Sequence, residues 1–504
     1  MIIPDFAVRT TVPWRPLPPR TGALPPAAKS GICPAVVVLA LTLPLLAGCA
    51  AARVDLAPCV ETAPTSSGAL NWRALGPFLE NRTSTDGKEH LLALPRPLFS
   101  EYSDAARGWL YRDYCWPLGF SRYRADGGYD YFTLAFHSFE NPESPTHVER
   151  WWLLPLLFFG RDRQGESYAA LFPVYGRIGN LASYDWVRFC LFPLYLETER
   201  AGARSKSLLW PILGRTDGER VEKRRVFPLY GYSRTAREKK QFILWPLGHT
   251  VVQYPDAAGR QGSGWFLLPL YGQFQQTDGT GATLYRSWTF LWPFFSGETG
   301  ADHDRFYGPW PFFRRERNTT ADLPVDQLHF WPFYGHIRRG TQDTTSIAWP
   351  FFVTTTNAWQ NGSASATILN PFYQAGEKRE NGQQVESHLQ IWPLWRFEKE
   401  GDTTRTAVLA IWPYRHQSPI ERNFAPFWTL YTCEHRATAV HHEALWGWFK
   451  LGGDTADAAY FSLAPLLDYS VTADRHRLSL LKGLLAWGRD ADGAHGRLLW
   501  FISW

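Results

Sequence analysis

Apolar and polar blocks alternate along most of the chain with a step near 20 residues; Pro77, Pro97 and Pro117, for example, are 20 residues apart. Each apolar block combines an aromatic or large aliphatic residue, a proline and a further large apolar residue. The clearest copy is Leu291-Trp292-Pro293-Phe294-Phe295. Self-similarity at a fixed period indicates one extended repeat architecture and not a set of separate globules.

The apolar runs are short, aromatic and bounded by turn residues, which is typical of strands. Asp86-Gly87, Asp217-Gly218 and Asp278-Gly279 lie in the polar blocks, and Asp-Gly supplies the positive φ of tight hairpins. The pattern predicts an all-β fold in which ~20-residue repeats form an antiparallel meander. We expect one β-repeat domain over residues 71–504, built as a large curled or closed, barrel-like sheet.

The repeated proline has no N–H for a strand ladder. If it lies within a strand, the chain bends there, and we expect the flanking aromatic residues to pack into one buried apolar belt. Under this interpretation Trp292→Ala costs ~3 kcal/mol or more. The alternative is an exposed aromatic binding platform. The tryptophans assigned to the belt are Trp116, Trp210, Trp245, Trp292, Trp331, Trp349, Trp392 and Trp412.

The amino terminus carries Arg9, Arg15 and Arg20 before an apolar run over 32–47, which ends in Leu46-Ala47-Gly48-Cys49. A basic flank, an apolar core and small residues before a cysteine are typical of a signal peptide. The last four residues resemble the lipobox of bacterial lipoproteins. This resemblance implies a signal peptide over 1–48, cleavage before Cys49, and lipidation of its thiol and new amino group.

Ala50 follows the lipidated position, which by family analogy implies delivery to the outer membrane. Residues 49–70 are rich in Ala, Pro, Ser and Thr, and we expect a lipidated flexible tether there. The membrane, reached through this lipid anchor, is therefore the first expected partner. Whether the protein faces the periplasm or the cell surface stays open.

The carboxyl terminus is apolar at Leu498, Trp500, Ile502 and Trp504, which resembles the terminal signal of outer-membrane β-barrels. Alternation also fits a lipid-facing strand. Against a barrel, prolines in many strands would leave backbone carbonyls unpaired within lipid. A transmembrane barrel and a curled or closed sheet outside the bilayer both remain open.

Candidate chemistry is sparse. Four cysteines follow the lipidated one, and they permit either two disulfides or free thiols. A cluster near residues 433–443 matches no zinc spacing, and an Asp-Gly turn explains Asp490 and Asp492 better than a calcium loop does. We assign no catalytic residue, no metal and no cofactor. The residues considered are Cys59, Cys115, Cys190, Cys433, His435, His441, His442 and Glu443.

A net charge of +5 over 504 residues argues against a nucleic-acid partner. We expect a non-enzymatic structural or interaction role at the cell envelope, with an envelope protein or a glycan as a further partner. One alternative is an outer-membrane barrel or trough that carries a solute or a lipid. A second alternative is a surface protein that binds polysaccharide through exposed aromatic rings.

Overall fold

The computed structural model describes residues 55–65, 69–144, 147–319, 324–415, 417–453, 458–491, 493–499 and 502–504. The predicted signal peptide and Cys49 lie outside these residues. The prediction of an all-β antiparallel meander is confirmed, because the described chain forms a 46-stranded sheet in which neighbouring strands in sequence pair antiparallel. The sheet is not closed or strongly curled, so that part of the expectation was wrong.

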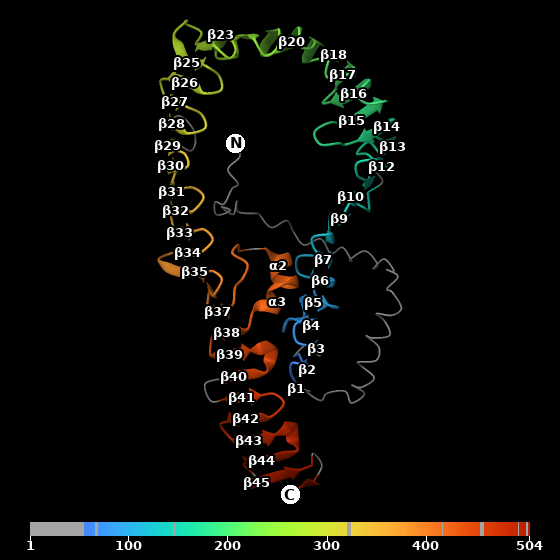
Figure 1. The fold of residues 1–504 in the computed structure, drawn as a ribbon, viewed down its shortest axis with the longest axis vertical. Helices are drawn as coiled ribbons and strands as arrows, with labels where there is room; N and C mark the ends of the chain where they lie inside the picture. The colour runs from blue at the N-terminus through green and yellow to red at the C-terminus, as the bar shows by residue number, and fades with distance from the viewer. Residues whose placement is uncertain are drawn as a thin grey trace. The chain divides into compact units, whose positions relative to one another are not determined.

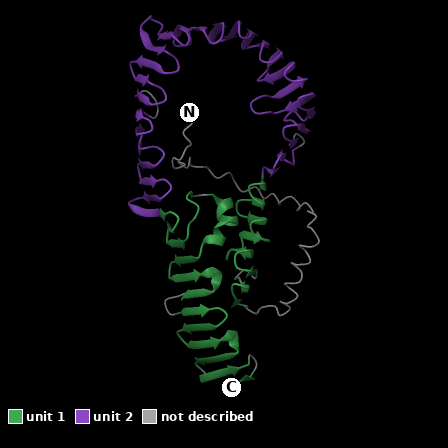
Figure 2. Cartoon of the chain, viewed as in Figure 1, with its two compact units in different colours: residues 1–125, 390–504 green, residues 126–389 purple. Residues whose placement is uncertain are grey.

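The chain divides into two compact units, coloured separately in Figure 2. Unit 1 combines residues 1–125 with residues 390–504, and unit 2 holds residues 126–389. We call the described residues 55–125 the first arm of unit 1, and residues 390–504 its second arm. The first arm begins inside the expected tether, and its strands are β1 Asp55–Leu56, β2 Val60–Pro64, β3 Leu70–Ala74, β4 Leu79–Thr83, β5 Glu89–Ala93, β6 Phe99–Asp104, β7 Trp109–Tyr114 and β8 Gly119–Arg124.

Unit 2 is a long run of hairpins (Figure 1). Its strands are β9 Gly127–Phe132, β10 Ala135–Glu140, β11 Val148–Leu153, β12 Leu157–Arg161, β13 Ser167–Leu171, β14 Tyr175–Gly179, β15 Trp186–Cys190, β16 Tyr195–Arg200, β17 Ala203–Leu208, β18 Leu213–Gly218, β19 Val221–Val226, β20 Tyr230–Thr235, β21 Glu238–Ile243, β22 Gly248–Gln253, β23 Gln261–Leu267, β24 Tyr271–Thr277, β25 Thr283–Phe290, β26 Phe295–Gly300, β27 His303–Tyr307, β28 Phe313–Asn318, β29 Val325–Phe330, β30 Tyr334–Arg339, β31 Gln342–Ile347, β32 Phe352–Trp359, β33 Gly362–Leu369, β34 Tyr373–Glu380 and β35 Gln383–Ile391.

The second arm interrupts its strands with short helices. Its elements are β36 Trp395–Glu400, β37 Thr403–Val408, α2 Ser418–Asn423, α3 Ala425–Trp428, β38 Tyr431–Arg436, β39 Ala439–Ala444, η1 Leu445–Gly447, β40 Phe449–Gly453, β41 Ala459–Leu463, β42 Leu467–Thr472, β43 Arg475–Leu480, η2 Leu481–Gly483, β44 Leu485–Asp490, β45 Gly493–Leu498 and β46 Ile502–Ser503. Within the described part of the chain, none of the helices has the length and apolar character that crossing a bilayer requires.

The prolines of the repeat lie in the connections and not within strands, which corrects the expected mid-strand bend. β19 and β20, for example, are joined by residues 227–229, which contain Pro228, whereas β20 and β21 are joined by Ala236 and Arg237. The peptide bond before Pro228 is cis, the arrangement of a type VI turn. In this position the missing N–H of proline removes no ladder hydrogen bond, so the strands stay regular.

Apolar and polar connections alternate, so unit 2 has two different edges at the ends of its strands. We call the edge formed by the proline connections the apolar rim, and the opposite one the polar edge. The rim connections of unit 2 are residues 154–156, 172–174, 191–194, 209–212, 227–229, 244–247, 268–270, 291–294, 308–312, 331–333, 348–351 and 370–372.

Successive rim connections are hydrogen-bonded to one another through the backbone. The N–H of Phe227 donates to the carbonyl of Ile212, and the N–H of Leu244 donates to that of Leu229, each at 2.7 Å. The N–H of Trp245 donates to the carbonyl of Pro228, also at 2.7 Å. The pairing of neighbouring strands thus continues through the turns, which form a ladder of their own.

The tryptophans assigned to the belt are not a buried core. Trp245 and Trp292 are 50% and 52% exposed, and Trp210 and Trp349 are also exposed. Trp116, Trp331, Trp392 and Trp412 are partly buried. The physical reason is that these residues lie in turns beyond the ends of the strands of a single sheet. Large side chains do cluster around β12 to β15, where Phe158, Tyr168, Ala170, Ile178 and Phe189 are buried together.

We predict that Phe189→Ala and Trp292→Ala have unequal effects. Phe189 is 2% exposed and its ring lies 5.5 Å from that of Phe172, so its truncation leaves a cavity and costs ~3 kcal/mol or more. Trp292→Ala removes a half-exposed ring and should cost about 1 kcal/mol. Urea midpoints and amide exchange of the neighbouring strands measure both losses. Equal losses would contradict this assignment of core and rim.

Candidate functional site

The apolar rim of unit 2 is an exposed surface of one chemical kind that continues from strand to strand. Its connections consist of large apolar residues, proline and a few Gly, Ala or Asn, and none of them contains Asp, Glu, Lys or Arg. Contiguous apolar surface of this kind marks interaction sites in soluble and membrane-associated proteins. The rim is therefore a candidate interaction surface.

Aromatic rings follow one another along parts of this rim. The ring centroids of Phe172 and Phe192 are 5.5 Å apart, and those of Phe192 and Trp210 are 5.8 Å apart. Phe227 and Trp245 repeat the arrangement at 5.3 Å. Rings at such separations attract one another beyond their area of burial. The rim side chains therefore support each other and are held in defined positions.

Charged residues of unit 2 lie farther from the rim, along the strands. Glu316 on β28 accepts hydrogen bonds from Arg305 at 3.0 Å and from Arg314 at 2.6 Å, and Gln327 also donates to it. Burial raises the pKa of the Glu316 carboxyl, but the hydrogen bonds from the two arginines outweigh it and lower the pKa to about 2. This carboxylate therefore stays ionised and pairs its neighbouring strands.

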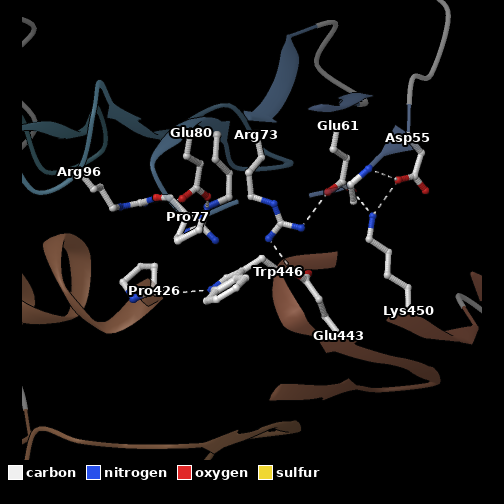
Figure 3. A network of polar contacts seen from close by, with 12 residues as sticks. Asp55, Glu61, Arg73, Pro77, Glu80, Arg96, Pro426, Glu443, Trp446 and Lys450 are labelled. Carbon is white, nitrogen blue, oxygen red and sulfur yellow. Dashed lines mark hydrogen bonds and ion pairs between the residues drawn. The ribbon is translucent and has the colours of Figure 1, made fainter. Parts of the chain in front are cut away.

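A second site lies in unit 1, where ion pairs join the two arms (Figure 3). Arg73 on β3 donates to Glu61 of its own arm at 2.8 Å and to Glu443 of the second arm at 2.6 Å. Arg73 is partly buried, where paired charges interact more strongly than at an open surface. We call the residues of this network the polar clasp; they are Asp55, Glu61, Arg73, Glu443, Lys450 and Lys482.

Two lysines of the second arm complete the clasp. Lys450 pairs with Glu61 and lies 3.5 Å from a carboxylate oxygen of Asp55. Lys482 lies 3.3 Å from the other oxygen of Asp55. Burial raises the pKa of Asp55, but the charges of Lys450 and Lys482 more than offset this, so the pKa is lowered overall. The first described strand of the chain is thus tied to its carboxyl-terminal part.

Helix α2 makes a more deeply buried contact with the first arm. Asp113 on β7 is fully buried, and it accepts hydrogen bonds from Arg122 at 2.6 Å and from Asn423 at 2.7 Å. Arg422 also pairs with it, and Ser100 donates to Asn423 at 2.6 Å. Burial raises the pKa of Asp113, but the charge of Arg422 and its hydrogen bonds lower it below the ordinary value. We call these five residues the aspartate cluster.

Apolar contacts between the arms lie beside these charges. The rings of Phe78 and Phe427 meet edge to face at 5.0 Å across the arms, and within the second arm Trp446 donates to the carbonyl of Pro426 at 2.8 Å. Phe78 and Trp446 belong to connections between strands, which correspond to the rim connections of unit 2. In unit 1, therefore, parts of one rim are covered by the other arm.

The charged residues in the rim connections of unit 1 occur where the arms meet. Arg96, in the connection between β5 and β6, is 2% exposed and donates to the carbonyls of Arg422 and Pro77, each at 2.8 Å. It also pairs with Glu80. Lys482 takes the position that Trp occupies in other repeats. A charged residue inside an otherwise apolar repeat is the sequence feature that could have indicated this contact.

The residues considered for metal binding have other partners. His442 is hydrogen-bonded to the Tyr431 hydroxyl at 2.7 Å, His441 to that of Tyr460 at 2.9 Å, and Glu443 pairs with Arg73. Within the residues that the structure describes, no three His, Cys, Asp or Glu side chains are grouped so that they could hold a metal ion. Four cysteines are free thiols: Cys59, Cys115 and Cys190, which are exposed, and Cys433, which is partly buried.

Comparisons with known proteins do not identify the chain. No family model matches it, and no match is found among curated proteins.

We predict that Asp113→Ala separates α2 from the first arm. The substitution leaves Arg122, Arg422 and Asn423 without their shared acceptor, and removing one member of a buried ion pair costs about 3 kcal/mol or more. Amide exchange over residues 417–428 should accelerate. Asp217→Ala is the control, because Asp217 is exposed and its surface ion pairs with Arg215 and Arg224 contribute little to stability. Amide exchange in α2 that stays as slow as in the wild type would contradict the prediction.

The lowered pKa of Glu316 predicts that part of the stability of the fold is lost in acid. Its pKa in the folded chain is about 2 against an ordinary 4.5, so its stabilisation is present above pH 4.5 and is lost as the pH falls toward 2. The ionised Glu316 carboxylate contributes up to about 3 kcal/mol to the free energy of unfolding. In Glu316→Gln, strands β27 to β29 should be weaker at pH 7 and their stability should depend less on pH. Urea titrations from pH 7 to pH 2 measure this.

The matched control is Glu377→Gln, in which an exposed carboxylate paired with Arg379 is neutralised. This substitution should leave the pH dependence of the urea midpoint as it is in the wild type. A Glu316→Gln protein whose acid sensitivity equals that of the wild type would show that this carboxylate is not responsible.

Proposed function

We propose that this chain is a lipoprotein, anchored to the outer membrane through Cys49, with a non-enzymatic structural or interaction role at the cell envelope. The observation that carries the proposal is the uncharged, exposed rim that runs along unit 2. A long surface of one chemical kind suits contact with an extended partner better than it suits the binding of one small molecule. The lipobox of residues 46–49 supplies the location.

The described residues also form two hollows of different size. The cavity lined by Arg396, Ala410 and Trp412 beside α2 has a volume of about 30 Å³. This is about the volume of one water molecule in the liquid and far below the ~300–1,000 Å³ of sites that enclose small ligands. A second hollow, which is open to solvent, has a volume of about 490 Å³ and is lined by Glu149, Trp151 and Arg161. Its size falls within that range. We favour the rim over both hollows because the rim runs from strand to strand along unit 2.

The alternative of a barrel is weaker on physical grounds. A barrel needs a sheet that closes on itself with a consistent stagger. Among the described strands, β1 is paired with β2 and β46 with β45, and the sheet is not closed. An open sheet with one apolar edge and one polar edge agrees better with attachment beside a membrane.

We predict that Cys49→Ser moves the protein out of the membrane fraction of a bacterium that processes lipoproteins, and that it abolishes incorporation of labelled palmitate. The physical reason is that several acyl chains on one residue give stable anchoring. Cys59→Ser is the matched control, because Cys59 is an exposed thiol ten residues further on that should carry no lipid. Palmitate incorporation by the Cys49→Ser protein would refute the anchor.

A further inference from the structure

The residue that follows each proline of the rim is exposed in every connection of unit 2. Leu229 and Leu270 are each 56% exposed, and Phe333 is 62% exposed. This position is occupied by Val, Leu, Ile, Phe or, between two prolines, Trp, and in unit 2 these residues are Leu156, Val174, Leu194, Ile212, Leu229, Leu247, Leu270, Phe294, Trp310, Phe312, Phe333, Phe351 and Phe372. The edge thus presents a row of large apolar tips.

The backbone beneath these tips pairs with neighbouring backbone. The N–H of Leu268 donates to the carbonyl of Leu247, that of Leu291 to Leu270, and that of Trp331 to Phe312, at 2.6–3.0 Å. In water such groups could be hydrated, but in lipid every polar backbone group needs a partner within the protein. The turn ladder supplies these partners without water.

The order of side chains across the edge matches the depth profile of a bilayer surface. Leu and Phe form most of the tips, and Trp or Phe lies one residue before most of the prolines, as at Trp245 and Phe227. Tyrosines such as Tyr230 and Tyr271 begin the following strands, and charged residues lie farther along the strands. Aromatic rings of this kind gather at the level of lipid headgroups, while aliphatic tips prefer the acyl region.

From these features we infer that the apolar rim of unit 2 inserts edge-on into the surface of a lipid bilayer, with its tips among the acyl chains and the polar edge in water. The inference deepens the proposed function, on which it rests for the position of the anchor. Residues 50–54 separate Cys49 from β1, so the acylated residue lies within about 20 Å of Asp55. A lipid held so close to the sheet keeps the whole chain at the bilayer surface, where a second contact forms at high effective concentration.

A lipid surface fits this rim better than a second copy of the chain does. Where the protein covers a rim with its own residues, in unit 1, the contact includes charged partners such as Arg96 and Lys482 inside the connections. The rim of unit 2 has no charged residue to orient a protein partner. A fluid apolar phase requires no such orientation, because burial of apolar surface is not directional.

The test compares two positions at opposite ends of β20. Leu229→Cys places a nitroxide spin label on the rim, and Ala236→Cys places the same label in an exposed connection of the polar edge, about 20 Å away across the strand. Cys59, Cys115, Cys190 and Cys433 are changed to Ser in both proteins. The mature protein is reconstituted into phosphatidylcholine vesicles, and collision of each label with oxygen and with a water-soluble nickel chelate is measured.

We expect the label at position 229 to be open to oxygen and shielded from nickel with vesicles, and open to nickel without them. The label at 236 should stay open to nickel in both cases. A label at 229 that is equally open to nickel with vesicles overturns the inference, as does one that is already shielded without vesicles, which would indicate a second copy. Shielding of both labels would mean that the sheet is immersed, which also overturns it.

The experiment distinguishes a wrong assignment of the lipid anchor at Cys49 from a wrong assignment of the rim as the membrane-inserting edge. If Cys49 carries no lipid, the labelled protein is mixed with preformed vesicles, and the same difference between positions 229 and 236 is expected. An anchored protein whose label at 229 remains in water keeps the proposed function and loses this inference. Circular dichroism of the two labelled proteins must agree, so that a folding defect is not taken for a difference in depth.

Discussion

The turn-to-turn backbone hydrogen bonds are the interaction on which the rest of the structure depends. In the described part of unit 2 each strand contacts mainly its two neighbours, so stability is a sum over nearest neighbours, as in other repeat architectures. The bonds from Phe227 to Ile212 and from Leu244 to Leu229 extend this pairing beyond the strand ends. They also fix the connections in one row, and this row is what turns scattered apolar residues into a continuous edge.

Unit 1 shows what the chain does where such an edge meets protein. Arg96 and Lys482 replace apolar side chains in the connections. Arg96 pairs with Glu80 of its own arm and donates to the carbonyl of Arg422 in the other arm, whereas Lys482 pairs with Asp55 of the opposite arm. The aspartate cluster adds a buried contact between α2 and β7. Buried charges of this kind are costly unless they are fully paired, which makes the arrangement specific to one partner surface. The uncharged rim of unit 2 is physically different and is suited to a partner that offers no fixed charges.

Much of the fold could be predicted from the sequence, because short apolar runs and Asp-Gly pairs recur at a regular step. The position of the prolines could not. A Leu-Trp-Pro-Leu segment such as residues 244–247 has the same sequence whether it bends a strand or joins two. Only the antiparallel pairing of Ile243 with Gly248 shows that it joins two strands. Burial was misjudged for the same reason, since Trp245 belongs to a turn and not to a packed face.

The polar clasp could not be predicted from the local sequence, because Arg73 and Glu443 are 370 residues apart and nothing near either residue indicates the other.

Insertion of the apolar rim into a bilayer is tested most directly by labelling the protein from within the membrane. A phospholipid with a photoactivatable acyl chain would be added to outer membranes that contain the intact protein, and modified peptides identified by mass spectrometry. We predict modification at rim connections such as 209–212, 244–247 and 291–294, with the peptide of Cys49 as internal reference. Modification of the Cys49 peptide alone, or of polar connections such as 254–260, would contradict it.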